Sequence, residues 1–192
     1  MDGYAADKNN SPAFLESVTL NKYSDLDQLA FLDSIDTILL GARTYQLFVD
    51  FWPTATNEQE VIADKLNSIP KIIFSSKLAR APWGKWPDAR VISTDACAAL
   101  RELKKQDGKD IVLWGSISLS QAFMRENLID EYHFRICPLV LGSGRPLFEN
   151  TGPLDFELYD TRRYESGLML LQYRQKSGGG KYFFYFKLLI IK

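Results

Sequence analysis

Three apolar stretches of this sequence end in small or hydroxyl residues that could bind phosphate. Helix N-terminal N–H groups and side-chain hydroxyls donate hydrogen bonds to phosphate oxygens, and in open α/β sheets they gather outside the carboxyl ends of the strands. The residues are Gly41, Arg43 and Thr44 after the first stretch, Ser75 and Ser76 after the second, and Gly115 and Ser116 after the third. Any one set could serve only to turn the chain. Together, and with a basic residue among them, they favour a phosphate-bearing ligand.

The motifs of two large nucleotide-binding classes are missing. No G-x-G-x-x-G and no G-x-x-x-x-G-K follows any of these stretches. Rossmann domains and P-loop NTPases use those spacings to bring backbone amides to phosphate groups. The sequence therefore supports neither class.

Two carboxylates, Asp25 and Asp27, lie at the start of the first expected helix and are candidates for acid–base chemistry. Capping and the helix dipole are enough to explain acids there. A helix-borne acid that faces a cleft could also donate a proton to a heterocyclic nitrogen. His133, the one histidine, lies on the Glu131–Arg135 face of an expected strand. A lone strand histidine is usually structural or solvated, so we do not place it among the catalytic candidates.

The composition is that of one globular domain without a strong net charge. The chain has 192 residues, 46% of them apolar and 24% charged, which suits a single domain with a sizeable core. Lys and Arg total 23 against 24 Asp and Glu, so no net field would attract nucleic acid or an anionic membrane. Two cysteines and one histidine are too few for a disulfide framework or a His/Cys zinc site. We expect a cytoplasmic protein without a metal ion.

Residues 110–148 are the segment around which we expect the chain to be arranged. Residues 111–114 predict a strand, Gly115-Ser116 a turn, and the apolar spacing of the next ten or so residues a helix. Residues 131–136 alternate between apolar and polar side chains, which is typical of a strand with one face covered. A glycine turn at 142–144 follows. Because no helix comes after it, we expect it to be structural or to line the edge of the site.

The remaining elements alternate between helices and strands. Helices are expected from Ser24, as N-cap, to residue 36, and at 42–48, 57–68 and 95–106. Strands are expected at 37–40, 71–74, 91–92, 154–164 and 168–174, the last two as an antiparallel hairpin. The prolines and glycine of 81–89 predict a loop with little regular structure. This order predicts an α/β domain with a mostly parallel central sheet.

The end of the chain adds a further expected strand. Residues 177–180, Ser-Gly-Gly-Gly, have the composition of a flexible linker and lead into KYFFYFKLLIIK at 181–192. A segment so rich in aromatic and aliphatic side chains would aggregate if it were exposed. We therefore expect it to be buried in the sheet of a single domain spanning residues 1–192.

Five segments resemble the dihydrofolate reductase-like superfamily. They are MDGYAA, TILLGARTY, KIIFSS, DIVLWGS and IDEYHFRICPLVLGSGRPLF. The most specific piece is D-E-Y followed by P-L-V-L-G-S-G-R-P-L-F. Within the superfamily the chain is most similar to the reductase domain of the bifunctional riboflavin-biosynthesis deaminase-reductases and to the stand-alone bacterial proteins related to it. The resemblance extends from residue 1 to about residue 174.

This resemblance implies a three-layer α/β fold and an NADPH-dependent reductase, with NADH as the alternative cofactor. The hydride would go to a pterin-like or aminopyrimidine substrate, or to the ribosyl carbon of the latter, as in riboflavin- or folate-type metabolism. The protein would supply orientation and electrostatics, since the nicotinamide carries the chemistry. Related proteins tend to be homodimers, so the resemblance also implies a homodimer whose other partner is a small heterocyclic molecule.

The family pattern also assigns roles to particular residues. The cofactor phosphates would meet Gly41, Arg43 and Thr44, the adenosine ribose side Ser75 and Ser76, and the pyrophosphate Gly115, Ser116 and Ile117. The nicotinamide and the substrate would lie beside Asp2, Gly3 and Tyr4. Asp2 thereby joins Asp25 and Asp27 as a catalytic candidate.

The chain departs from the family pattern at two places. The family usually has arginine directly after the glycine of the second segment, whereas here Ala42 stands between Gly41 and Arg43. Together with the lack of a firm catalytic acid, this departure makes a non-catalytic nucleotide-binding module with the same fold the alternative function. Family members also begin with a central strand that leads into the D-G-Y loop, and here the loop stands first. Residues 181–192 have the character of that strand, so we expect a circular permutation, with a strand exchanged between subunits or an extraneous tail as the alternatives.

Overall fold

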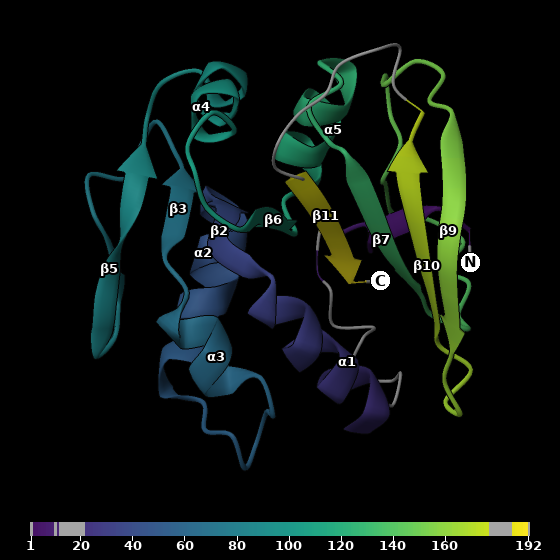
Figure 1. Cartoon of the computed structure of the whole chain (residues 1–192), viewed down its shortest axis with the longest axis horizontal. Helices are drawn as coiled ribbons and strands as arrows, with labels where there is room; N and C mark the ends of the chain where they lie inside the picture. The colour runs from purple at the N-terminus through teal and green to yellow at the C-terminus, as the bar shows by residue number, and fades with distance from the viewer. Residues whose placement is uncertain (1, 10, 12–21, 177–185, 192) are drawn as a thin grey trace.

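The computed structural model describes residues 2–9, 11, 22–176 and 186–191, and its centre is a nine-stranded sheet (Figure 1). Across the sheet the strands are β4 (Ala81–Trp83), β5 (Trp86–Ile92), β3 (Lys71–Phe74), β2 (Ile35–Gly41), β6 (Asp110–Trp114), β11 (Phe186–Ile191), β7 (Glu131–Ile136), β10 (Met169–Gln175) and β9 (Phe156–Arg163). Neighbouring strands from β5 to β7 are parallel. The hairpin of β9 and β10 is antiparallel. This confirms the α/β fold with a mostly parallel sheet and a C-terminal hairpin.

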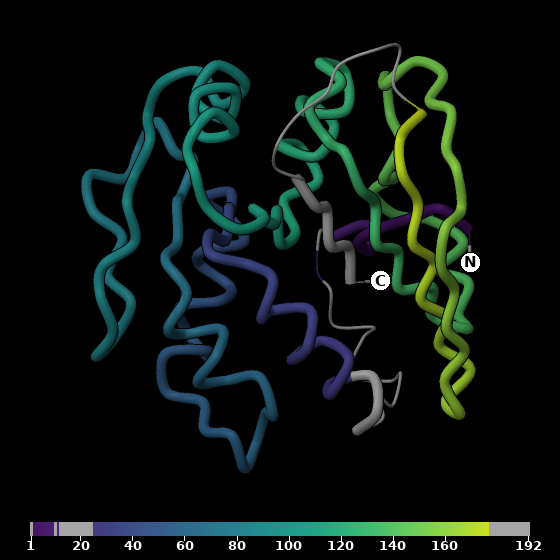
Figure 2. Tube along the Cα trace, in the orientation of Figure 1, coloured from purple at the N-terminus to yellow at the C-terminus, as the bar shows by residue number. Residues whose placement is uncertain are grey.

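The chain fills this sheet in two halves. Residues 35–92 form one side and residues 131–175 the other, with residues 110–114 between them (Figure 2). A separate two-stranded sheet joins β1 (Tyr4–Ala6) to β8 (Arg145–Pro146). The segments at the two ends of the sequence are thus held against its middle.

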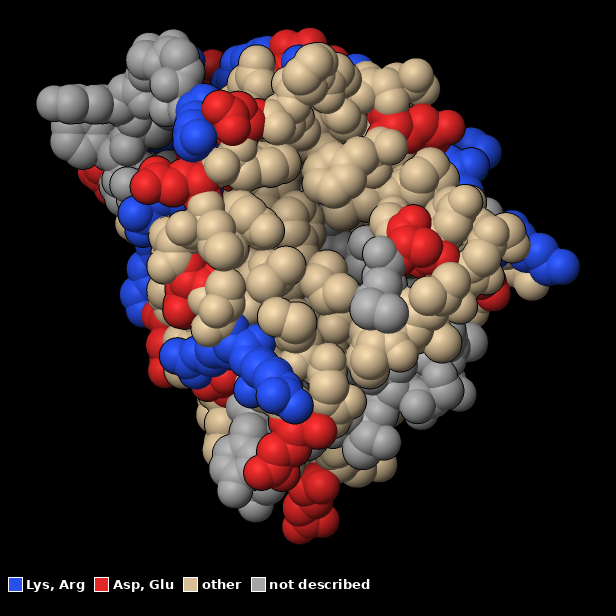
Figure 3. All heavy atoms as spheres, turned by 90° about the vertical axis from the view of Figure 1, so that its right-hand side faces the viewer, with Lys and Arg blue, Asp and Glu red and all other residues tan. Residues whose placement is uncertain are grey.

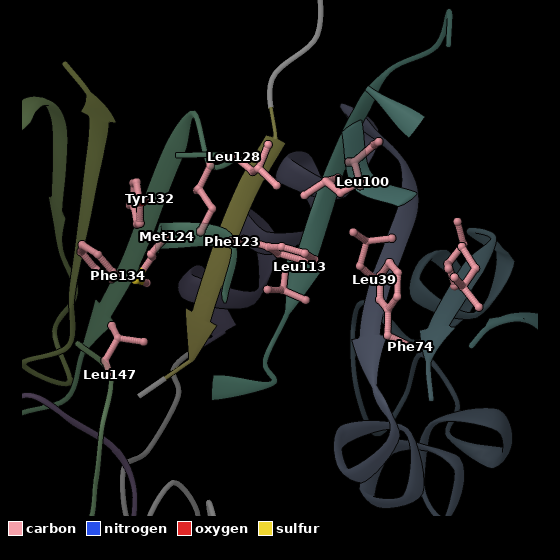
Figure 4. Close-up of a cluster of buried hydrophobic side chains, with 14 residues drawn as sticks. Leu39, Phe74, Leu100, Leu113, Phe123, Met124, Leu128, Tyr132, Phe134 and Leu147 are labelled. Atoms are coloured by element: carbon pink, nitrogen blue, oxygen red, sulfur yellow. The ribbon is translucent and has the colours of Figure 1, made fainter. Parts of the chain in front are cut away.

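Helices cover both faces of the sheet. On one face lie α1 (Lys22–Asp33), α2 (Ala42–Val49), the 3-10 helix η2 (Trp52–Thr54) and α3 (Ala63–Ser68); on the other lie α4 (Ala96–Leu103) and α5 (Ile117–Arg125). Leu39 belongs to the core cluster under α4 and α5, whereas Ile38 and Leu40 belong to the cluster under α1 to α3. Figure 4 shows how side chains of α4, α5 and the strands of the sheet meet in the first of these clusters. Apolar layers on both faces explain why β2, β3 and β6 are continuous hydrophobic runs.

The prediction of a loop at residues 81–89 is wrong. These residues form β4 and the start of β5, which pair antiparallel around a turn in which Gly84 has a φ of 60°. Because β4 is at the edge of the sheet, its proline leaves no ladder hydrogen bond unmade. Trp83 is fully buried and donates a 2.7 Å hydrogen bond from Nε1 to Asn67 Oδ1. Tertiary packing of this indole therefore overrides the local turn signals.

Two helix boundaries also differ from the expected ones. α1 begins at Lys22, so Ser24 lies inside the helix and is not its N-cap. The third helix covers 63–68 and not 57–68. The Asn57 side chain accepts a hydrogen bond from the Asp64 N–H and donates one to its carboxylate, at 2.9 and 2.7 Å. Such side-chain bonds satisfy the backbone in turns and compete with helix formation.

The C-terminal strand is central, so the prediction of an extraneous surface tail is wrong. β11 pairs parallel with β6, from Phe186 opposite Ile111, and parallel with β7 on its other side. It occupies the position in which the family resemblance expects the first strand. The linker at 177–180, residues 181–185 and Lys192 lie outside the described residues. Circular permutation itself stays a prediction.

None of the described helices is both long and apolar enough to cross a membrane. The described residues also contain no group of three or more His, Cys, Asp or Glu side chains that could hold a metal ion.

Candidate functional site

The carboxyl ends of β3, β2 and β6 lie level with one another. Gly41 pairs with Phe74, the last residue of β3. Leu39 pairs with Leu113, so the register places Gly41 level with Gly115 two residues later. Three of the sequence motifs therefore meet at one edge of the sheet, where ligands of open α/β sheets bind.

The turns after β2 and β6 are in close contact. A Cβ atom at Gly41 would lie 2.9 Å from the Ser116 Cβ and nearer still to its Oγ, and one at Gly115 would lie 3.1 Å from the Thr44 Cγ2. Gly115 and Ser116 both have left-handed backbones, with φ of 81° and 62°. A side chain at either glycine would separate the two turns, so residues 41–44 and 115–116 form one site.

Two helices begin at this site with their first N–H groups uncapped by side chains. The N-caps of α2 and α5 are Gly41 and Ser116, and neither makes a side-chain capping bond. By contrast, α4 is capped by Asp95, whose carboxylate accepts a 2.6 Å hydrogen bond from the Ala98 N–H. Arg43 lies exposed in the first turn of α2. Uncapped N-termini and a guanidinium are the groups that bind an anion such as pyrophosphate.

The serines after β3 are adjacent to this site but partly committed to the fold. The Ser75 Oγ accepts hydrogen bonds from the N–H groups of Lys77 and Leu78, at 3.2 and 3.1 Å. Ser76 is exposed. Ser75 therefore has a structural role in its turn, and its hydroxyl hydrogen is the group left for a ligand.

Asp2, Gly3 and Tyr4 are held by the segment 142–147, which contains the glycine turn. The Gly142 N–H donates a 2.8 Å hydrogen bond to Asp2, and this bond holds the pKa of that carboxyl below its ordinary value. The Gly3 carbonyl accepts a 3.0 Å bond from the Leu147 N–H, and Tyr4 belongs to β1, which pairs with β8. The glycine turn therefore has a structural contact with Asp2, and this contact joins two loops.

A cavity of about 270 Å³ opens between α1 and the strands β7, β10 and β9. Asp27 lies in its wall, whereas Asp25 does not. The Tyr164 hydroxyl donates a 2.6 Å hydrogen bond to Asp27, which also pairs with Arg162. Burial, and next the bond to Asp27, raises the pKa of Tyr164 to about 12, so this phenol remains a donor at neutral pH. Of the two acids at the start of α1, the structure therefore places Asp27 in a site.

Gln28 contributes a buried donor to the same cavity. Its side chain is 7% exposed, and its Nε2 has no hydrogen-bond partner among the described residues. Most buried polar groups are paired with protein or with ordered water. An Nε2 left over in a cavity wall is therefore suited to an acceptor atom on a ligand. No pattern in the sequence singles out this residue.

The polar face of β7 is buried, contrary to the expectation that one face of this strand is covered. Glu131, His133 and Arg135 are 4%, 3% and 2% exposed. His133 and Arg135 line the cavity opposite α1. The sequence shows that apolar and polar residues alternate along this strand. It does not show that a helix and a hairpin cover the polar face.

The cavity and the glycine site lie at neighbouring places on the sheet. Leu189 of β11 pairs with Trp114 on one side and His133 on the other, so these two residues are level and two strands apart. Two strand spacings amount to about 10 Å. Trp114 directly precedes Gly115, and it packs in the cluster under α1 to α3. A ligand in the cavity and one on the glycine turns could therefore touch.

A family model with the description RibD C-terminal domain matches residues 1–170. This chain belongs to the RibD C-terminal domain family. It is 32% identical over 153 residues to the uncharacterized protein YyaP of Bacillus subtilis (strain 168), which covers 78% of this chain and 79% of that protein. The predicted resemblance to riboflavin-biosynthesis reductase domains is thereby confirmed.

Solved structures share the fold of this RibD C-terminal domain. A putative riboflavin biosynthesis protein from Shewanella sp. PV-4 has a TM-score of 0.74 at 23% identity, over 92% of this chain and 94% of that one. A diaminohydroxyphosphoribosylaminopyrimidine deaminase/5-amino-6-(5-phosphoribosylamino)uracil reductase from Thermotoga maritima has a TM-score of 0.59 at 14% identity, over 90% of this chain and 53% of that one. The chain thus spans about half of the bifunctional protein. The likeness establishes the dihydrofolate reductase-like fold.

Proposed function

We propose that this RibD C-terminal domain is an NADPH-dependent reductase whose substrate occupies the cavity beside α1. The observation that carries the proposal is the pair of uncapped helix N-termini at Gly41 and Ser116, level with each other and next to that cavity. A dinucleotide needs a phosphate site and, within reach of it, room for a second molecule. This chain supplies both at one edge of its sheet.

The residues of the glycine site fit the cofactor. The first N–H groups of α2 and α5 would bind the pyrophosphate, and Gly41 and Gly115 would let it approach the backbone. Arg43 would add a charge-assisted hydrogen bond to a phosphate. Bound NADPH would supply the hydride.

The cavity fits a planar nitrogen heterocycle of the pterin or aminopyrimidine class. The Asp27 carboxylate can accept hydrogen bonds from ring or exocyclic N–H groups, and the Gln28 Nε2 can donate one to a ring carbonyl. The Phe31 ring in the same wall offers a flat apolar contact. The volume of about 270 Å³ suits one small ring system with part of its substituent.

Titration of the four tryptophans with NADPH and with NADH tests the proposal. We expect NADPH to quench the emission, because Trp114 directly precedes the glycine turn of β6. Loss of NADPH absorbance on addition of 5-amino-6-(5-phosphoribosylamino)uracil or dihydrofolate would then establish turnover. Quenching without turnover of either compound would favour the non-catalytic nucleotide-binding module. Absence of quenching by both cofactors would contradict both functions.

Replacing Arg43 with alanine is expected to weaken NADPH binding by about tenfold. The guanidinium is exposed in the first turn of α2, where it can reach a bound phosphate, and a hydrogen bond to a charged group contributes about 1.5–3 kcal/mol. Arg125→Ala, in the last turn of α5, is the matched control and should leave the dissociation constant unchanged. Equal constants for wild type and Arg43→Ala would remove Arg43 from the site.

We further propose that the protein forms a homodimer through the face that carries β9. This strand is at the edge of the sheet, and Leu158, Phe148 and Met169 are 48%, 43% and 40% exposed. Figure 3 shows this side of the molecule, with a broad central area in which uncharged side chains predominate. An exposed edge strand with apolar residues is usually covered in native proteins.

Leu158→Lys is therefore expected to give a monomer in analytical ultracentrifugation, where the wild type sediments as a dimer. Leu47→Lys, at a position 50% exposed on α2, should leave the dimer intact. A wild-type monomer, or a dimer that survives Leu158→Lys, would contradict this interface.

A further inference from the structure

We propose that His133 is the proton donor of the reduction and that Tyr159 and Glu131 are positioning residues which hold its imidazole; this rests on the proposed function. His133 is buried at 3% exposure and lines the cavity. The sequence gave it no catalytic role, because a strand histidine with a solvated face was expected. Neighbouring side chains fix the orientation of its imidazole, as an acid–base group in an active site requires.

One ring nitrogen of His133 is anchored by hydrogen bonds around the buried Glu131. The His133 Nε2 lies 3.0 Å from the Tyr159 hydroxyl and 3.4 Å from the Glu131 Oε2. The Tyr159 hydroxyl donates its hydrogen to the same Glu131 oxygen, at 2.9 Å. Toward the imidazole the hydroxyl oxygen can therefore only accept, and the hydrogen of that bond belongs to the His133 Nε2. The Arg174 Nε lies 3.2 Å from the other Glu131 oxygen. Nε2 therefore points into the protein and carries a hydrogen.

A β-bulge aims Tyr159 at this histidine. In the β9–β10 ladder Leu158 pairs with Tyr173 and Asp160 pairs with Gln172, so Tyr159 is the extra residue. Bulges re-aim side chains and are frequent next to active sites. Burial, and next the bond to Glu131, raises the pKa of Tyr159, so its hydroxyl stays protonated. The β-bulge in the edge hairpin thus brings the Tyr159 hydroxyl into contact with His133.

The other ring nitrogen, Nδ1, is the one a substrate can use. The Gln172 Nε2 lies 3.2 Å from Nδ1 and 3.4 Å from Nε2. Because Nε2 carries the hydrogen, the Gln172 amide donates to the Nδ1 lone pair, and a bound substrate would take the place of this amide. Gln172 and Phe31 line the cavity with His133, and the Phe31 ring lies 5.1 Å from the imidazole between centroids. The hydrogen-bond partner of Nδ1 is therefore a cavity-lining amide that a substrate could displace.

The position suits the chemistry of hydride addition to a C=N bond. The hydride adds to the carbon, the π electron pair moves to the nitrogen, and that nitrogen takes a proton. An imidazolium at His133 would give up its Nδ1 proton in this step and become neutral, and solvent would restore the proton before the next turnover. The level register of His133 with Trp114 places the donor two strand spacings, about 10 Å, from the end of β6, with β11 between them.

The charged and titratable groups around the imidazole come from each element that packs there. They are Glu131 and Arg135 of β7, Tyr159 and Arg162 of β9, Arg174 of β10, Tyr164 after β9, and Asp27 of α1. Glu131 is the carboxylate in contact with the ring. The Asp27 carboxylate is shared between Tyr164 and Arg162, which leaves His133 as the acid at the opposite wall.

The test measures turnover of NADPH with 5-amino-6-(5-phosphoribosylamino)uracil at saturating concentrations. His133→Gln, which keeps a hydrogen-bonding atom near the Nε2 position, is expected to lower kcat by about 100-fold with the NADPH dissociation constant within twofold of wild type. The wild-type kcat should fall as the pH rises, and this dependence should be absent in His133→Gln. Tyr159→Phe keeps the aromatic ring and removes the hydroxyl that joins His133 to Glu131, so we expect a loss in kcat of about tenfold.

A ligand-free measurement separates this proposal from a purely structural role. The chain has one histidine, so its imidazole ¹⁵N spectrum contains one pair of signals. Wild type should show a protonated Nε2 and an unprotonated Nδ1 near pH 8, and Tyr159→Phe should show a mixture of the two tautomers. A folded His133→Gln with wild-type kcat and pH dependence, or an Nδ1–H tautomer in wild type, would overturn the proposal. If wild type itself does not oxidise NADPH with this substrate, the reductase function fails first and the proton donor falls with it.

Discussion

A chain that ends at Lys176 is expected not to fold. β11 is hydrogen-bonded to β6 on one side and to β7 on the other, and it links the two halves of the sheet. Its removal would leave both neighbours with unpaired N–H and C=O groups in the middle of the protein. The expected loss is the whole free energy of unfolding, which for a domain of this kind is about 5–15 kcal/mol. Far- and near-ultraviolet circular dichroism during urea denaturation would show a broad, non-cooperative change in place of a single transition.

The same denaturation experiment tests the predicted permutation when the C-terminal strand is moved to the N-terminus of the shortened chain. A chain in which residues 181–192 precede Met1 and the sequence ends at Lys176 should regain cooperative unfolding, because it follows the order of strands that the family resemblance implies. Cooperative unfolding of the shortened chain without that addition would show that β11 is dispensable. Failure of the rearranged chain to fold would contradict the permutation while leaving the central pairing of β11 intact.

The fold could be predicted from the sequence wherever a local pattern and the tertiary packing agree. Strands 71–74 and 111–114 are mostly apolar and are followed by serine or glycine, and the structure has them within one residue of the expected bounds. The 81–89 segment could not be predicted, because its strands are stabilised by the burial of Trp83 against distant residues and not by any local preference.

The candidate site divides in the same way. Gly41, Gly115 and Ser116 follow strands, so the rule for carboxyl ends of a parallel sheet brings them together from sequence alone. The cavity wall depends on the covering of the second face of β7, on the bulge at Tyr159, and on the side chain of Gln28. These are products of register and of packing between segments far apart in the chain. Alternation in a single strand shows which residues share a face, but not what covers that face.

Gly41→Ala is expected to disturb both the stability of the protein and its affinity for NADPH. The new Cβ would lie 2.9 Å from the Ser116 Cβ and closer to its Oγ, so the turns after β2 and β6 must separate. Overpacking of this kind costs about 1–3 kcal/mol of unfolding free energy. Because the uncapped N–H groups of α2 and α5 would move apart, we expect NADPH binding to weaken by at least about tenfold, from a loss of about 1.4 kcal/mol.

A double-mutant cycle isolates the contact between the two turns. Ser116→Gly removes the two atoms that lie closer than 3.0 Å to the new Cβ. It also places glycine at a residue whose φ is 62°, so alone it should change stability by less than about 1 kcal/mol. Combined with Gly41→Ala it should restore most of the lost stability, which gives a coupling energy of at least about 1 kcal/mol. Gly142→Ala is the control, because its φ is 72° but no atom lies within 4 Å of the added Cβ; its cost should be unaffected by Ser116→Gly. If the costs of Gly41→Ala and Ser116→Gly simply add, the two turns do not touch, and the phosphate site between α2 and α5 loses its physical basis.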